Sequence, residues 1–98
     1  MPSYSFILPS DFADYELEVT SKGWFPEAEL IVSGKRYRLN FYDPVRLGQD
    51  IEGELAEGRV FFEPNVVVVR SVTRVNMEQA AEHLAQSVYV EMLIPEKT

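Results

Sequence analysis

The 98-residue sequence contains no cysteine, which excludes disulfide bonds, thiolate zinc sites and a cysteine nucleophile. It holds a single histidine, so one chain cannot build a metal site from several histidines. Its longest wholly apolar run, residues 66–69, is far too short to span a bilayer. Residues 1–9 lack the charged start and long apolar core of a secretory signal, and we therefore expect a cytoplasmic protein without membrane contact.

Basic residues are scarce. Nine Lys and Arg stand against sixteen Asp and Glu, which gives a net charge of −7. Nucleic acid recognition needs the opposite sign, so a nucleic acid partner is excluded. What is present is typical of a folded domain, with 46% apolar and 12% aromatic residues. Because the chain is short and shows no repeat or linker, we expect residues 1–98 to form one domain.

The first part of the chain reads as strands. Residues 4–8 form a short one, and residues 15–20 alternate, with Tyr15, Leu17 and Val19 on one face. Residues 29–32 and 36–41 flank a glycine turn, which indicates a hairpin. A loop at Ser33-Gly34 or at Gly34-Lys35 fits the pattern. The first choice pairs Leu30 with Tyr37, Ala28 with Leu39, and Glu29 with Arg38.

A helix is predicted after this hairpin. Asp43 can cap its first turn and Pro44 suits its first position. Gly48 and Gly53 each weaken it by about 1 kcal/mol relative to alanine, so packing must hold it. Gly58 is typical of a helix end. The apolar stripe of this helix repeats every four residues: Leu47, Ile51 and Leu55.

The remaining chain reads as three strands and a second helix. Residues 59–62, 66–72 and 88–94 are the strands, and the four-valine run is typical of a central strand. Asn76 is the expected cap of the second helix. Its predicted buried stripe is Met77, Ala80, Ala81 and Leu84. The order ββββ-α-ββ-α-β predicts an α+β fold, with a mostly antiparallel or mixed sheet and two helices on one face.

His83 is the one side chain that titrates near neutrality without a perturbed pKa. A catalytic base needs an orienting carboxylate and a nucleophile within hydrogen-bond reach. Glu82, its neighbour, points away on a helix. We therefore expect a surface histidine, no catalytic residue, no metal and no cofactor, and a protein that is not an enzyme. If the protein were an enzyme, we would expect its active-site groups in a pocket around Tyr42, Asp43 and Arg46.

Carboxylates gather in two regions. Asp50, Glu54 and Glu57 fall on one side of the first helix, because three- and four-residue steps align them. They read as a solvated face or as a secondary docking surface for a basic partner. The larger group lies in residues 1–34, which hold six acids and one base. If its strands are neighbours, it forms an acidic sheet surface, for which the alternative role is solubility.

Trp24 lies beside this acidic group and reads equally as an interface anchor or as a lid on the core. An anchor ringed by carboxylates suits a basic protein partner. The predicted partner-binding residues are Asp11, Asp14, Glu16, Glu18, Trp24, Glu27 and Glu29.

The blocks at residues 41–51 and 62–69, FYDPVRLGQDI and FEPNVVVV, resemble small uncharacterised bacterial proteins that consist of one stand-alone domain. In size, acidity and α+β pattern the chain is also similar to immunity proteins that neutralise secreted bacterial toxins. This second likeness is one of composition and carries over no residue.

These observations favour a non-enzymatic protein-interaction domain that binds a basic partner, with an immunity or inhibitor protein as one form of it. The alternative is a homo-oligomer, a homodimer for example, that associates through a sheet edge or the valine-rich strand. A small-ligand-binding role is the other alternative.

Overall fold

The computed structural model describes residues 3–96. They form an α+β domain, as predicted, but the order of elements differs from the predicted one, and three α-helices replace the expected two. The elements are β1 (Tyr4–Ile7), α1 (Phe12–Lys22), β2 (Trp24–Val32), β3 (Lys35–Tyr42), α2 (Pro44–Ala56), β4 (Val66–Val68), α3 (Arg74–Ala85) and the 3-10 helix η1 (Val88–Met92).

The four strands form one mixed sheet in the order β1-β2-β3-β4. β1, β2 and β3 are antiparallel neighbours, whereas β4 runs parallel to β3. The β2–β3 hairpin closes through Ser33-Gly34, whose φ angles of 53° and 78° match a primed two-residue turn. The predicted pairing of Leu30 with Tyr37 and of Glu29 with Arg38 is confirmed.

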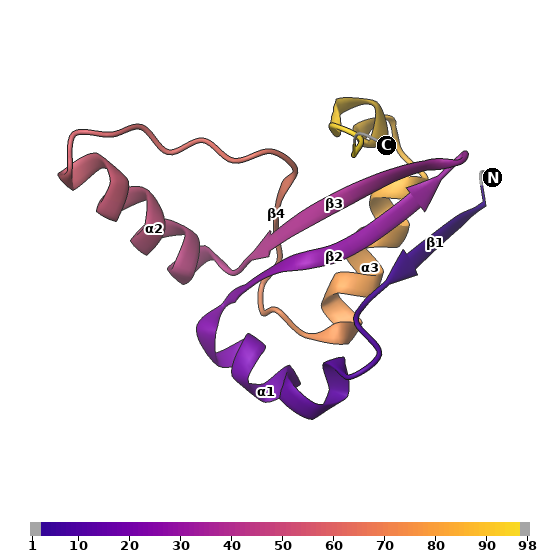
Figure 1. The fold of residues 1–98 in the computed structure, drawn as a ribbon, viewed down its shortest axis with the longest axis horizontal. Helices are drawn as coiled ribbons and strands as arrows, with labels where there is room; N and C mark the ends of the chain where they lie inside the picture. The colour runs from indigo at the N-terminus through magenta and orange to yellow at the C-terminus, as the bar shows by residue number, and fades with distance from the viewer. Residues whose placement is uncertain (1–2, 97–98) are drawn as a thin grey trace.

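The core lies between one face of this sheet and α3, with α1 at the end of the sheet (Figure 1). Residues of β2 and β3 such as Leu30, Leu39 and Phe41 are completely buried there. The predicted stripe of α3 is confirmed, since Met77 and Ala81 are buried and its other two members are half-buried. The helix begins earlier than expected because Thr73, not Asn76, caps it.

The strand predicted at residues 15–20 is wrong, because these residues belong to helix α1. Tyr15 and Val19 fit both the alternation of a strand and the spacing of a helix, and Phe12 decides between the two structures. Phe12 is buried at a spacing of three and seven residues from the other two, whereas Leu17 is 87% exposed. Gly23 ends the helix in the left-handed conformation, at φ 72°. Glu16 and Glu18 therefore do not form an acidic sheet surface.

The later strands are also corrected. Residues 59–62 are irregular, and only Val66–Val68 of the predicted strand pairs, at the sheet edge and not at its centre. Residues 88–92 turn into η1, whose start is capped by the Ser87 hydroxyl. Val90 and Leu93 pack against the core from this segment. Their three-residue spacing suits a 3-10 turn, in which such side chains lie on one side.

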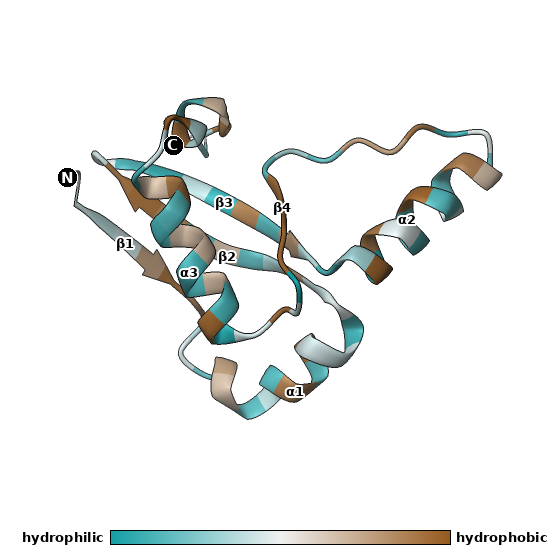
Figure 2. Cartoon of the chain, turned by 180° about the vertical axis from the view of Figure 1, so that it is seen from behind, coloured by the Kyte–Doolittle hydropathy of each residue, from teal (hydrophilic) through white to brown (hydrophobic). Residues whose placement is uncertain are grey.

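Helix α2 projects away from the sheet, and the following chain runs back beside it (Figures 1 and 2). We call residues 44–63 the arm. The predicted helix is confirmed, with Asp43 as cap and Pro44 in its first turn. Its expected packing is only partial, because Leu47 and Ile51 are half-buried, Leu55 is 54% exposed and no residue of α2 is fully buried. Within residues 3–96, no helix is long and apolar enough to cross a membrane.

Candidate functional site at the base of the arm

The arm is joined to the body through Gly23 and Asp43. The backbone N–H of Asp43 donates to the Gly23 carbonyl at 2.9 Å, and the Asp43 carboxylate accepts from the N–H of Arg46 at 2.7 Å. The end of α1 and the start of α2 are thus bonded to each other. A side chain at position 23 would overlap the Asp43 carboxylate, so glycine is required there for space as well as for its positive φ.

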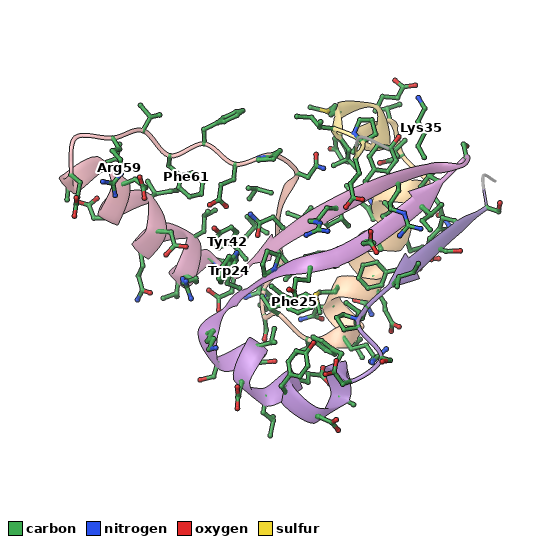
Figure 3. The ribbon with its side chains drawn as sticks, viewed as in Figure 1. Trp24, Phe25, Lys35, Tyr42, Arg59 and Phe61 are labelled. Carbon is green, nitrogen blue, oxygen red and sulfur yellow. The ribbon has the colours of Figure 1, made fainter. Side chains whose placement is uncertain are left out.

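Four side chains form a hydrogen-bonded group on the sheet face opposite the core. The indole N–H of Trp24 donates to Asn40 Oδ1 at 2.8 Å. The Asn40 amide and the Tyr42 hydroxyl then both donate to Glu63 Oε1, each at 2.6 Å. We call Trp24, Asn40, Tyr42 and Glu63 the Glu63 cluster. It links the sheet to the chain that returns from α2, and Figure 3 shows Trp24 and Tyr42 at the base of that helix.

Arg46 closes this cluster from the side of α2. Its guanidinium lies 5.1 Å from the centre of the Trp24 ring, within the range of a cation–π contact. It also donates to Asp50 Oδ1 at 2.9 Å and to the Lys22 carbonyl at 3.2 Å. Trp24 is therefore half-buried by polar and aromatic neighbours, and it is neither a free anchor nor a lid on the main core.

Tyr42 is completely buried, between Trp24 and Phe61, whose ring centres each lie 6.3 Å from its own. Burial raises the pKa of its phenol well above the usual value of 10, and the hydrogen bond to Glu63 and the charge of Glu63 add to the rise. The phenol consequently stays protonated as a hydrogen-bond donor. This protonation state suits a structural role and not that of a nucleophile.

A hollow of about 580 Å³ opens between α2 and the returning segment. We call it the arm hollow. Four carboxylates line it, from Asp50, Glu54 and Glu57 on the helix and from Glu63 on the return. Phe61 lies on its wall, where its side chain points from the returning segment toward α2 (Figure 3). The arm hollow is therefore acidic and partly aromatic.

Arg59 is the one cation that lines the arm hollow in the described chain. It donates to Glu54 at 2.6 Å and to Glu57 at 3.1 Å. The hydrogen bond from Arg59 lowers the pKa of Glu54, so this carboxylate stays ionised. A general acid would need a raised pKa. Glu54 thus contributes fixed negative charge to the hollow.

The residues predicted to bind a partner divide between two elements. Asp11 at the start of α1, and Asp14 and Glu18 on it, are exposed. Glu16 accepts the backbone N–H of Arg74 at 2.7 Å and so holds α1 to the start of α3.

On β2, Glu27 is exposed and Glu29 pairs with Arg36 at 3.0 Å. Trp24, on the same strand, belongs to the Glu63 cluster and contacts Arg46. The structure therefore does not gather these acids on one sheet face. Their role in binding stays a prediction.

The three carboxylates predicted as a secondary docking surface are brought together in the structure. Asp50, Glu54 and Glu57 lie on one side of α2, as predicted, and all three line the arm hollow. Sequence reasoning missed Glu63 and Phe61, which complete it. Glu63 precedes a proline and reads as a turn, and its partners Asn40 and Tyr42 are more than twenty residues away. Only the path of the returning chain reveals the connection.

The remaining candidates for chemistry stay separate. His83 is exposed on α3, and its ring lies 5.7 Å from that of Tyr89. Among residues 3–96, no three His, Asp or Glu side chains are grouped to hold a metal ion. Comparison with protein-family models, with curated proteins and with solved structures finds no match to this chain.

Proposed function

We propose that the chain is a non-enzymatic interaction domain whose arm hollow receives a basic segment of a protein partner. The observation that carries this proposal is the arm hollow itself. Four carboxylates and an aromatic ring surround an open volume on an element that projects from the body. A projecting element is accessible to a large partner, whereas an enzyme active site is normally an enclosed cavity that excludes water.

The chemistry of the hollow favours a guanidinium or ammonium group. Arg59 already holds its guanidinium between Glu54 and Glu57, which demonstrates that the spacing of these carboxylates suits a planar cation. Asp50 is bonded to Arg46, and Glu63 to two neutral donors. The carboxylates outnumber the cations here. A second cation can be accommodated beside Phe61, whose ring adds a cation–π contact.

The test compares two variants that remove the same charge from different places. One carries Glu54→Gln and Glu57→Gln in the hollow. The other carries Asp14→Asn and Glu18→Gln on exposed positions of α1. Tagged proteins are used to capture partners from the source cells at low and high salt, and the affinity of the identified partner is then measured with purified components. We expect a basic partner that is lost at high salt and lost with the hollow variant alone.

The outcomes separate the surfaces. Equal weakening by both variants would mean that only net charge matters, and loss with the α1 variant alone would place the contact on α1. Capture that is indifferent to salt would contradict an electrostatic partner altogether. An immunity or inhibitor protein is the concrete form of the proposal, and it requires in addition that the captured partner loses its activity when bound.

A further inference from the structure

The outer edge of β4 is free of a neighbouring strand in the described chain. Peptide groups of a strand alternate in direction. The Asn65 carbonyl accepts from Asn40, and the N–H of Val69 donates to Tyr42, so residues of odd number face β3. The peptide groups of Val66 and Val68 therefore face outward, and β4 is the last strand of the sheet on that side. Such an edge is a template for another strand.

Exposed apolar side chains concentrate in three segments of the chain. Thirteen large apolar residues of the described chain are exposed, and nine belong to the arm, to β4 or to the η1 region. A hollow of about 500 Å³ lies beside β4, with mainly apolar walls that include Leu84, Tyr89 and Met92. The nine exposed residues are Val45, Leu55, Val60, Phe62, Val68, Val88, Tyr89, Met92 and Ile94.

Helix α2 needs a surface to pack against. It has thirteen residues, includes Gly48 and Gly53, and has no fully buried side chain. A helix of this length is marginal in water without tertiary contacts, and two glycines weaken it further. The arm projects on the side of the free β4 edge (Figure 1). A chain that occupies this edge will therefore meet the arm as well.

The charges indicate what this chain is. Helix α2 carries Asp50, Glu52 and Glu54 against one arginine, whereas residues 64–77 contain Arg70 and Arg74 and no acid. Among the described residues, Arg70 forms no salt bridge, and it lies at the base of α2 beside the end of β4. The acidic arm of one copy thus complements the β4 segment of another, whereas two arms would repel each other.

We propose that two copies of this chain form a two-fold dimer in which β4 pairs antiparallel with β4 of the second copy, and each arm covers the apolar hollow of the other. Because Val66 and Val68 face outward, the two-fold axis passes at Val67 and sets Val66 opposite the Val68 of the second copy. Nine half- to four-fifths-exposed side chains from each copy supply roughly 1,000 Å² of apolar surface. That area exceeds the roughly 800 Å² that each partner buries in a standard specific interface.

The test measures the mass of the purified chain by sedimentation over a range of concentrations. We expect a species of about twice the 11.2 kDa chain mass. Val68→Lys blocks the edge, and Phe62→Lys places a charge on the apolar surface of the arm. Each should weaken the dimer at least tenfold. Leu17→Lys, on α1, is the control, because Leu17 is more exposed than either residue and lies outside the proposed interface.

Thermal unfolding of each variant confirms that it is folded, since all three positions are exposed. A wild-type chain that stays monomeric up to millimolar concentration would overturn the proposal, as would a dimer that neither variant weakens. Partner capture by Val68→Lys keeps the two proposals apart, because Val68 does not line the arm hollow, whereas Phe62 does. If this variant loses the dimer but still captures the partner, the basic-partner proposal stands. If it keeps the dimer but no longer captures the partner, the dimer proposal stands and the basic-partner proposal fails.

Discussion

The β2–β3 hairpin and the arm are both encoded by short local patterns, yet they end in opposite environments. The hairpin places Leu30, Leu39 and Phe41 completely inside the core. The arm helix has an equally regular stripe and a well-formed cap, yet Leu47 and Ile51 are only half-buried and Leu55 is exposed. The comparison teaches that spacing and capping determine which element forms. Burial depends on which other elements face it, and in residues 3–96 no helix or strand packs extensively on the arm.

The sharpest way to break this comparison is a matched pair of leucine substitutions. Leu39 is completely buried and Leu55 is 54% exposed. Leu39→Ala should destabilise the domain by about 2–5 kcal/mol, because it removes apolar contacts and leaves a cavity. Leu55→Ala should cost less than about 1 kcal/mol at concentrations where the chain is monomeric. Urea unfolding monitored by circular dichroism measures both.

Measuring the two leucine variants again at high protein concentration makes their comparison more informative. Above the dissociation constant of the dimer, Leu55→Ala should become more destabilising, since the interface then contributes to stability. A cost for Leu55→Ala that equals that of Leu39→Ala in the monomer would show that the arm packs on its own body.

A pair of glycine substitutions tests the joint between body and arm. Both Gly23 and Gly34 have a positive φ, which costs alanine about 1–2 kcal/mol. At Gly34 the added methyl group meets open space, whereas at Gly23 it overlaps the carboxylate of Asp43 that caps α2. Gly23→Ala should therefore cost about 1 kcal/mol more than Gly34→Ala, the usual value of a lost cap. Equal losses in thermal unfolding would show that Asp43 moves aside without consequence.

The local part of the fold was predictable, and the non-local part was not. The hairpin register follows from Ser33-Gly34 and the alternation on both sides, and the start of α2 follows from Asp43 and Pro44. All of these signals are local in the chain. The parallel pairing of β4 with β3 joins residues more than twenty positions apart, and no local pattern encodes it.

Helix α1 was missed for a different reason. Tyr15 and Val19 satisfy both a strand and a helix period, so the residues between them could not decide. Phe12 before them, Lys22 in the last turn and Gly23 after it carry the helical signal. The candidate site divides in the same way. Helical spacing predicts its three carboxylates on α2, but Glu63 joins them only because the chain turns back after α2.

Tyr42 allows the Glu63 cluster to be tested by pH. Tyr42→Phe removes one of the two hydrogen bonds to Glu63 Oε1 and should cost about 1–2 kcal/mol near neutral pH. The raised pKa of Tyr42 stabilises the folded state fully below pH 10, where the phenol is protonated in both states. As pH rises above 10, the unfolded phenol ionises first, so stability is lost.

The wild-type chain should therefore lose stability above pH 10 more steeply than Tyr42→Phe, measured as the urea midpoint at each pH. Parallel curves for the two proteins would mean that Tyr42 is not the group responsible. Tyr37→Phe is the matched control, because Tyr37 is a buried tyrosine of the same strand, on the opposite face.

The smallest changes in stability are expected at surface ion pairs of the arm and the hairpin. Their effects on binding are the finest probe of the arm. Arg59 on the arm and Arg36 on the hairpin each bond glutamate and are each about half exposed, so neither Arg59→Gln nor Arg36→Gln should alter stability much. Their effects on a basic partner should differ. Arg59→Gln removes the cation that competes inside the arm hollow and should strengthen binding several-fold, most of all at low salt. Arg36→Gln makes the same change in net charge away from the hollow and should strengthen binding much less. If the two variants bind equally, the partner responds to overall charge, and the arm contributes no more to binding than the hairpin does.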